Sequence, residues 1–320
     1  MSEHSLHPAR VLLIMGPTAS GKSSLALALA GQTGAVIINA DAMQVYRDLA
    51  VLSNRPTPEE EAGVPHRLFG HVDGAERFSV GKWLQQARIA IAEAQAAHRP
   101  AIVVGGTGLY FKALTQGLAP AAPGSEAVRA ALRKALQEEG APALHARLAR
   151  RDPEGAARLA PQDGVRIMRA LEVLEAEGAP LRTLHAHSNG ALHRDGWVGV
   201  TLDTPREVLQ ARIAGRFEAM LRLGALGEAA RLLARSLDPG LPVMKAHGAP
   251  ALMAHLRGEV SLAEASDAAI VDTRRYAKRQ RTWVAHQMTD WPRCEAQALH
   301  ARTAWALQVW RNIDGARHLA

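Results

Sequence analysis

The stretch Gly16-Pro-Thr-Ala-Ser-Gly-Lys-Ser23 is the most specific motif in the sequence. It matches the pattern G-x-x-x-x-G-K-[ST], whose glycines allow backbone N–H groups to surround phosphate oxygens. The lysine adds a positive charge, and the final hydroxyl can coordinate Mg²⁺. An apolar run, residues 11–15, precedes this stretch, and a helix-forming run, residues 24–30, follows it. This strand, loop and helix context is what the pattern requires, so we predict that a phosphate or diphosphate binds here.

Strand and helix signals alternate up to residue 118, which is typical of a parallel, doubly wound α/β sheet. Apolar runs at residues 35–40 and 101–104 are two of the predicted strands. From residue 119 to residue 196 helical periodicity dominates, and residues 197–202 then predict a strand that returns to the sheet. We therefore predict a P-loop NTPase-like parallel sheet core with an all-helical insertion. The predicted domains are core residues 1–118 and 197–290, the insertion at residues 119–196, and a peripheral C-terminal segment at residues 291–320.

The overall composition is that of a globular protein, with 48% hydrophobic and 22% charged residues. The net charge of +7 favours an anionic partner, nucleic acid first. A single cysteine, Cys294, excludes a disulfide framework and a cysteine-based metal site. Residues 1–10 contain no apolar signal segment, and no later run is long, apolar and uncharged. We therefore expect a soluble, cytoplasmic protein without a membrane anchor, and we take a monomer as the default.

Two polar side chains follow predicted strands and are candidates for the chemistry. Asp41 comes directly after the strand at residues 35–40, and Thr107 lies in the glycine-rich turn after the strand at residues 101–104. Ligands of open α/β sheets bind beyond the carboxyl ends of the strands, so both side chains are expected near the phosphate loop. A nucleotide kinase is possible on these residues alone, because Asp41 could hold Mg²⁺. The strand at residues 101–104 is not followed by an acidic residue, so a kinase would lack a second acidic ligand for Mg²⁺.

Further motifs occur in a fixed order along the chain. They are Asp41-Ala-Met-Gln-Val-Tyr46, Arg55-Pro-Thr-Pro-Glu-Glu60, Val64-Pro-His-Arg-Leu68, Val104-Gly-Gly-Thr-Gly-Leu-Tyr-Phe-Lys-Ala-Leu114 and Arg274-Arg-Tyr-Ala-Lys-Arg-Gln-Arg-Thr-Trp283. Together with the phosphate loop, they resemble the tRNA dimethylallyltransferase (tRNA isopentenyltransferase) family over roughly residues 10 to 287. The resemblance implies transfer of a dimethylallyl group from dimethylallyl diphosphate to the exocyclic amine of the adenine on the 3′ side of the anticodon.

The resemblance also implies roles for single residues. Diphosphate would be a leaving group, stabilised by the loop, by Lys22 and by Mg²⁺ on Ser23. Asp41 would be the general base for the adenine amine, Thr107 would donate to the bridging oxygen, and Arg216 matches the family's diphosphate-binding arginine. The predicted diphosphate-binding residues are Gly16, Pro17, Thr18, Ala19, Ser20, Gly21, Lys22 and Ser23.

The target adenine must leave the anticodon stack to reach such a site, as enzymes that act on a base require. Basic residues that cover much of one predicted helix after Thr273 suit tRNA phosphates. The tRNA-contacting residues that the resemblance implies are Asp41, Ala42, Met43, Gln44, Thr107, Arg129, Gln162, Asp163, Gly164, Val165, Arg166, Lys245, Ala246, His247, Gly248, Ala249, Pro250, Thr273, Arg274, Arg275, Lys278, Arg279 and Gln280. The chain departs from the family's common pattern at Ala42, at residues 52–55 and at Ala249-Pro250.

Three functions other than a tRNA prenyltransferase are compatible with a phosphate loop. The first is a prenyltransferase that acts on free adenine nucleotide, which would need neither the helical insertion nor the basic helix. The second is a P-loop nucleotide kinase, which would transfer phosphate from ATP. The third is a tRNA-binding protein without catalysis, which the presence of Lys22, Ser23, Asp41 and Thr107 opposes.

Overall fold

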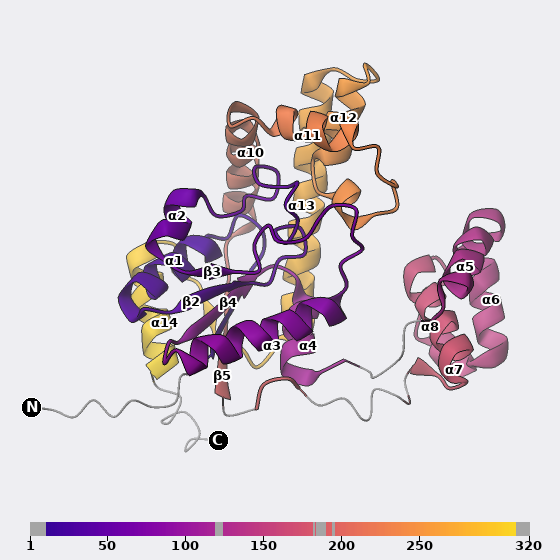
Figure 1. Cartoon of the computed structure of the whole chain (residues 1–320), viewed down its shortest axis with the longest axis horizontal. Helices are drawn as coiled ribbons and strands as arrows, with labels where there is room; N and C mark the ends of the chain where they lie inside the picture. Colours follow the sequence, from indigo (N-terminus) through magenta and orange to yellow (C-terminus); the bar gives the residue numbers. More distant parts are fainter. Residues whose placement is uncertain (1–10, 119–123, 182, 184–189, 194–195, 312–320) are drawn as a thin grey trace, which may run out of the picture. The chain divides into compact units, whose positions relative to one another are not determined.

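The computed structural model describes residues 11–118, 124–181, 183, 190–193 and 196–311. Contacts within the chain divide it into two compact units. One unit is a core that extends to Leu114 and resumes at Leu192; the other comprises Thr115–Ala191 (Figure 1). The helical unit therefore begins and ends a few residues before the predicted bounds of 119 and 196.

The core is built on one parallel sheet, as predicted. Among the described residues, six strands pair in the order β3-β2-β4-β1-β5-β6, and every pairing is parallel. The strands are β1 (Val11–Met15), β2 (Val36–Asn39), β3 (His66–Arg67), β4 (Ala101–Gly105), β5 (Trp197–Leu202) and β6 (Arg293–Cys294). All residues of β1, β2 and β4 are buried, because helices cover both faces of such a sheet. The carboxyl ends of β1, β2 and β4 are followed by the residues predicted to form the site.

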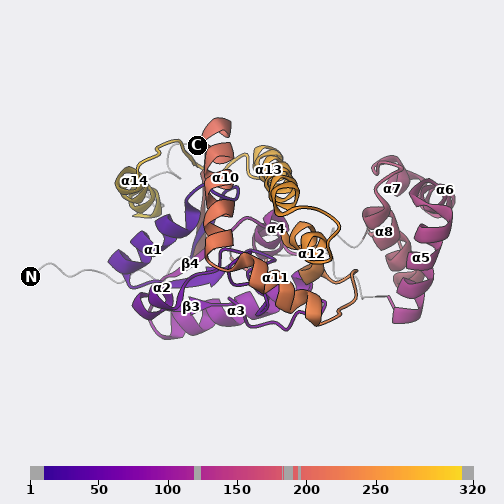
Figure 2. The same ribbon diagram turned by 90° about the horizontal axis from the view of Figure 1, so that it is seen from above.

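Helices pack on this sheet and extend beyond it (Figures 1 and 2). The helices of the core are α1 (Lys22–Thr33), α2 (Pro58–Gly63), α3 (Val80–Ala96), α4 (Gly108–Gln116), α10 (Arg206–Arg222), α11 (Ala225–Ala234), α12 (Ala249–Leu256), α13 (Leu262–Gln287) and α14 (Leu299–Arg311), with a 3₁₀ turn at Pro242–Lys245. Ser261 and Glu264 have the spacing of a capping box in the sequence, and this capping box is present at the start of α13. The Ser261 hydroxyl accepts the Glu264 N–H at 3.2 Å, and the Glu264 carboxylate accepts the Ser261 N–H at 2.8 Å.

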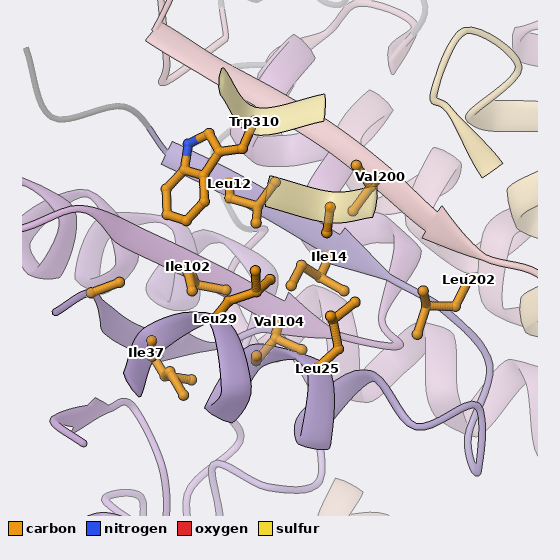
Figure 3. Packing of buried hydrophobic residues seen from close by; sticks show 14 of the residues in the cluster. Leu12, Ile14, Leu25, Leu29, Ile37, Ile102, Val104, Val200, Leu202 and Trp310 are labelled. Carbon is orange, nitrogen blue, oxygen red and sulfur yellow. The ribbon is translucent and has the colours of Figure 1, made fainter. Parts of the chain in front are cut away.

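One hydrophobic cluster joins the sheet to α1 and α14. Leu25 and Leu29 of α1 and Trp310 of α14 pack with Leu12 and Ile14 of β1 (Figure 3). Burying a leucine side chain completely contributes on the order of 1.5–3 kcal/mol. The phosphate loop, residues 16–23, connects β1 to α1, so this cluster fixes both of its ends.

The described part of the second unit is all-helical, and its helices confirm the predicted helical periodicity. They are α5 (Glu126–Glu139), α6 (Ala141–Arg151), α7 (Pro153–Ala157) and α8 (Gly164–Glu177). Leucine and isoleucine side chains from α5, α6 and α8 form a core of their own. The large buried side chains of this core are Leu132, Leu144, Leu148, Ile167, Leu171 and Leu174.

Three features of the core differ from the sequence-based expectation. The C-terminal segment is not peripheral, because β6 extends the sheet and α14 packs on α1. Residues 239–250 are predicted from the sequence to form a loop, but α12 already begins at Ala249; Pro250 lies in its first turn, where a proline is tolerated. Asp203-Thr204-Pro205 predicts an N-cap before the proline, but the N-cap of α10 is Pro205 itself, because the Thr204 side chain is buried and bonded elsewhere.

Candidate active site

The phosphate loop has the backbone geometry of an anion site. Gly21 and Ala19 have left-handed φ angles of 89° and 64°. Alternation of this kind turns successive N–H groups toward one point. Gly21 caps α1 without a side-chain hydrogen bond, so the helix N-terminus keeps N–H groups for a ligand. Ser23 is exposed in the first turn of α1.

Lys22 lies at the end of the phosphate loop, and its pKa is lower than that of an ordinary lysine. Its Nζ atom is 3.4 Å from the carbonyl oxygen of Pro17. Burial lowers the pKa of Lys22 to about 8; the Asp41 carboxylate opposes this change and the Arg216 guanidinium adds to it. A bound anion would restore the charged form, because an opposite charge favours it.

Asp41 and Thr107 lie beside each other at the ends of β2 and β4, as their positions after the strands predicted. The Thr107 hydroxyl accepts the Ala42 N–H at 3.0 Å, and the Thr107 N–H donates to the Ala40 carbonyl at 3.2 Å. The Asp41 carboxylate accepts the Met43 N–H at 2.9 Å, which fixes the orientation of its side chain. These hydrogen bonds hold the turn after β2 and the turn after β4 together.

A cavity of about 60 Å³ contains Asp41. Its lining residues are Thr18, Asp41, Met43, Leu52, Ser53, Ile213, Arg216, Phe217, Met220, Ala246, His247, Thr273 and Tyr276. Thr18 of the phosphate loop, Asp41 and Arg216 are polar members of this lining, and Ile213, Phe217 and Met220 of α10 are apolar members. The lining therefore offers polar partners for an anion next to apolar contacts for a short hydrocarbon group.

Arg216 connects α10 to the phosphate loop. Its Nη2 atom donates to the Thr18 hydroxyl at 2.5 Å. Burial lowers the pKa of Arg216, and the nearby Asp41 carboxylate opposes part of this change. The guanidinium stays protonated because the ordinary pKa of arginine lies far above neutral pH. The structure therefore places two cations, Arg216 and Lys22, close enough to Asp41 to interact with it electrostatically.

The apolar side chains of α10 that line the cavity, here called the apolar wall, were not predicted, although their helical spacing in the sequence indicates them. Ile213, Phe217 and Met220 lie on α10 at positions three or four residues apart, which places them on one face of the helix together with Arg216. Their side chains are buried. A search for apolar residues at this spacing around the predicted arginine would have identified the wall.

Tyr276 of α13 is a second residue that sequence analysis missed. It interacts with the Thr107 and Gln280 side chains, and its ring centroid lies 4.4 Å from that of His247. Burial and the Asp41 charge raise the pKa of Tyr276, so its hydroxyl stays protonated. His247, in turn, pairs with the Asp272 carboxylate. Tyr276 lies within the motif at residues 274–283, where the surrounding basic residues indicate an exposed helix and not a buried ring.

Gln280, one of the predicted tRNA contacts, is buried and bonded to two segments of the backbone. Its side-chain carbonyl accepts the Thr18 N–H at 2.8 Å, and its amide donates to the Gly106 carbonyl at 2.9 Å. Only 4% of the residue is exposed. A Cβ atom at Gly106 would lie 2.0 Å from the amide nitrogen, so this approach requires glycine. Gln280 joins the phosphate loop to the turn after β4.

Three more predicted tRNA contacts are either buried or bonded to other residues of the protein. The Gln44 amide donates to the carbonyls of Ser53 and Asn54. Ala249 is completely buried in α12. Arg129 of the helical unit donates to the Glu172 carboxylate at 2.6 Å. Burial raises the pKa of Glu172, but Arg129 and Arg169 outweigh it and hold the pKa below its usual value.

Other predicted contacts are exposed to solvent. Val165 of α8 is 74% exposed, and its neighbours Gln162 and Arg166 are exposed as well. On α13 the basic side chains of Arg274, Arg275, Lys278, Arg279 and Arg281 are exposed. Four of these, all but Arg279, line a larger cavity of about 720 Å³ between α10 and α13. The structure thus presents a basic surface on the helix that carries Gln280 and Tyr276.

Models of two protein families match this sequence. The family described as IPP transferase matches residues 44–287, and the family described as Isopentenyl transferase matches residues 9–69. The chain belongs to the IPP transferase family. The resemblance that the sequence motifs indicated is thereby confirmed.

Individual relatives agree with the IPP transferase assignment. A tRNA dimethylallyltransferase of Rhodopseudomonas palustris is 56% identical over 295 residues, which are 91% of this chain and 92% of the relative. A tRNA dimethylallyltransferase of Azorhizobium caulinodans is 56% identical over 290 residues, 90% of this chain and 93% of the relative.

Solved structures agree with the architecture. The full-length tRNA isopentenylpyrophosphate transferase of Bacillus halodurans has a TM-score of 0.68 at 30% identity, over 97% of this chain and 99% of that one. A eukaryotic dimethylallyltransferase acting on tRNA has a TM-score of 0.75 at 24% identity, over 97% of this chain and 77% of that one. The second likeness concerns the fold alone. No helix within the described ranges has the length and apolar character needed to span a membrane.

Proposed function

We propose that this protein transfers a dimethylallyl group from dimethylallyl diphosphate to the exocyclic amine of the adenine 3′-adjacent to the anticodon in tRNA, releasing diphosphate. One observation carries the proposal: Thr18 of the phosphate loop, Asp41 and Arg216 line one cavity together with the apolar side chains of Ile213, Phe217 and Met220. An anion site beside a carboxylate and a hydrocarbon pocket suits a prenyl diphosphate. A phosphoryl acceptor would have no use for the apolar wall.

The reaction needs stabilisation of a departing anion. The bond between the prenyl C1 and the bridging oxygen breaks, and its electron pair leaves with diphosphate. Lys22, Arg216 and the loop N–H groups would stabilise the charge that develops. The Thr107 hydroxyl accepts a hydrogen bond from Ala42, so its own proton can be donated to the bridging oxygen.

The reaction also needs a base for the acceptor. The adenine nitrogen forms the new bond to C1, and the proton it loses would pass to Asp41. The Met43 N–H and the Asn39 side chain hold the Asp41 segment in place. This arrangement orients a carboxylate toward the same cavity that receives the prenyl group.

The donor set fits Mg²⁺ bound together with diphosphate. No cluster of three or more His, Cys, Asp or Glu side chains occurs among the residues that the structure describes. Mg²⁺ commonly takes one or two protein ligands and completes its shell with phosphate oxygens and water. The exposed Ser23 hydroxyl at the loop would be one ligand, and the ion would neutralise charge on the leaving group.

The basic surface of α13 favours tRNA over a free nucleotide as the acceptor. Arg274, Arg275 and Lys278 are exposed on the helix whose Tyr276 lines the cavity. Successive cations next to the site suit several phosphates of one chain, whereas a mononucleotide offers few. We also propose a monomer, which acts in the cytoplasm.

A competition assay tests the function. Labelled dimethylallyl diphosphate and Mg²⁺ are supplied with an anticodon stem-loop and AMP in the same tube, and Lys22→Ala serves as the inactive control. Label on the stem-loop alone is expected. Label on AMP would establish the free-nucleotide alternative instead. Absence of label, combined with phosphate transfer from ATP to a nucleotide, would establish a kinase.

A further inference from the structure

A buried arginine from the C-terminal helix lies against the phosphate loop. Arg302 of α14 is 2% exposed, and its Nη1 atom donates to the carbonyl oxygen of Ser20. Its other nitrogens donate to the Thr204 hydroxyl at 3.3 Å, to the Gln297 side chain at 3.0 Å and to the Ala296 carbonyl at 2.5 Å. Three carbonyls and one hydroxyl thus hold the guanidinium in a single orientation.

The contact with Ser20 constrains the peptide that joins Ser20 to Gly21. In a trans peptide, the carbonyl and the following N–H point in opposite directions. Fixing the Ser20 carbonyl on Arg302 therefore directs the Gly21 N–H away from α14. A hydrogen bond from a cation to the carbonyl also polarises the peptide, which strengthens its N–H as a donor. Both effects favour binding of an anion by this N–H.

The fit around Gly21 is close. A Cβ atom at this position would lie 2.8 Å from Nη1 of Arg302, and Gly21 has a φ of 89°. The Ser20 hydroxyl is buried, and among the described residues it has no hydrogen-bond partner. The Ser20 N–H donates to Pro17, and its carbonyl is held by Arg302. The orientation of this part of the loop therefore depends on the arginine.

The charge of Arg302 adds to this geometry. An arginine stays protonated inside a protein, and the hydrogen-bond acceptors described above are all uncharged. Taking an isolated charge out of water is unfavourable unless other interactions compensate. An anion on the other side of the loop would compensate, since charges interact strongly where the effective dielectric constant is low.

We propose that Arg302 is a positioning residue of the phosphate loop, which aims the Gly21 N–H at the bound diphosphate and adds a positive charge behind it. The proposal rests on the proposed function only for the identity of the anion. It assigns a role in the site to a segment that lies beyond residue 287, where the match to the IPP transferase family ends.

Binding of inorganic pyrophosphate in the presence of Mg²⁺ tests the proposal without any transfer reaction. Calorimetry compares the unchanged protein with Arg302→Ala, Arg302→Lys and the control Arg311→Ala, which removes an exposed arginine from the same helix. We expect Arg302→Ala to weaken pyrophosphate binding about 10- to 100-fold. Arg302→Lys keeps the charge and should weaken binding less, and Arg311→Ala should leave it unchanged. Added guanidinium ion should partly restore binding to Arg302→Ala.

Kinetics supply a second readout that a purely structural role would not move. Arg302→Ala should raise KM for dimethylallyl diphosphate by a similar factor and leave KM for the stem-loop unchanged. Unchanged pyrophosphate binding by folded Arg302→Ala would overturn the proposal. Loss of folding in all Arg302 variants would also overturn it, because it would assign the arginine to folding alone. If the unchanged protein binds pyrophosphate but transfers no prenyl group, the proposed function fails while this test still stands.

Discussion

The side-chain carbonyl of Gln280 accepts the backbone N–H of Thr18 at 2.8 Å, which ties the basic helix α13 to the phosphate loop. The same side chain donates to Gly106 at 2.9 Å, so one residue joins three segments. The surface proposed to bind tRNA and the loop proposed to bind diphosphate therefore share a rigid connection. Displacement of α13 would move Thr18 directly.

Gln280→Ala should remove both contacts and leave two inward-facing backbone groups without partners. Each such group costs about 1–3 kcal/mol. We expect the free energy of unfolding to fall by about 2–4 kcal/mol and KM for dimethylallyl diphosphate to rise. Urea denaturation and steady-state kinetics measure the two effects. Thr282→Ala, an exposed change on the same helix, should alter neither.

Asp41→Asn should lower prenyl transfer by about 10²- to 10⁴-fold if the carboxylate is the base. The amide can still accept the Met43 N–H, so the turn and the cavity should persist. Binding of the stem-loop should therefore change little. Single-turnover transfer and a filter-binding assay separate the two quantities. Transfer close to that of the unchanged protein would exclude Asp41 as the base.

Much of the fold could be predicted because its signals are local. The strands β1, β2, β4 and β5 are apolar runs, and the helices of the second unit follow a regular helical period. Residues 66–67 and 293–294 form strands of two residues, which are too short to show any period. Their pairing depends on distant segments of the chain, which sequence patterns do not report.

Residues of the candidate site could be predicted where they stand directly after a strand or within a sequence motif. The phosphate loop, Asp41 and Thr107 are such cases. Gln280 and Arg302 are the opposite: in sequence each resembles a solvated polar residue on a helix, yet both are buried and bonded to the phosphate loop. Burial of a polar side chain is decided by the partners that the fold brings to it, and the phosphate-loop partners of these two residues lie more than two hundred residues away in the sequence.

Replacing Arg274, Arg275 and Lys278 with glutamine should weaken binding of the stem-loop and flatten its salt dependence. Each phosphate contact contributes about 0.7–0.9 to the slope of log K against log salt concentration. Loss of all three contacts should lower the slope by about 2–3. Arg88→Gln, an exposed change on α3, is the control. A slope equal to that of the unchanged protein would mean that this surface does not face tRNA.

Glu228 of α11 supports one wall of the cavity. Its carboxylate accepts the backbone N–H groups of Ala50, Val51 and Leu52 at 2.8–2.9 Å, and Leu52 lines the cavity. Glu228→Ala leaves these donors without the carboxylate, so we expect a loss of about 3 kcal/mol or more in the free energy of unfolding. Glu218→Ala, which is exposed on α10, should cost far less. Chemical denaturation of both variants checks the difference.

The pKa of Lys22 predicts how pyrophosphate binding depends on pH. Because burial lowers this pKa to about 8, free Lys22 loses its proton as the pH rises through that value. The charged form binds the anion, so the pKa must be higher in the complex. Affinity should be greatest below about pH 8 and should fall by up to about tenfold per pH unit above it.

The Lys22→Arg variant separates deprotonation of the lysine from the ionisation of pyrophosphate itself. Lys22→Arg keeps its charge throughout the range, so its affinity should not show the decline above about pH 8 that the lysine causes. Calorimetry of both proteins between pH 6.5 and 9.5 (a range of about 1.5 units on either side of the pKa) makes the comparison. If both proteins show the same pH profile, the decline belongs to the ligand or to another group, and Lys22 is already charged in the free protein.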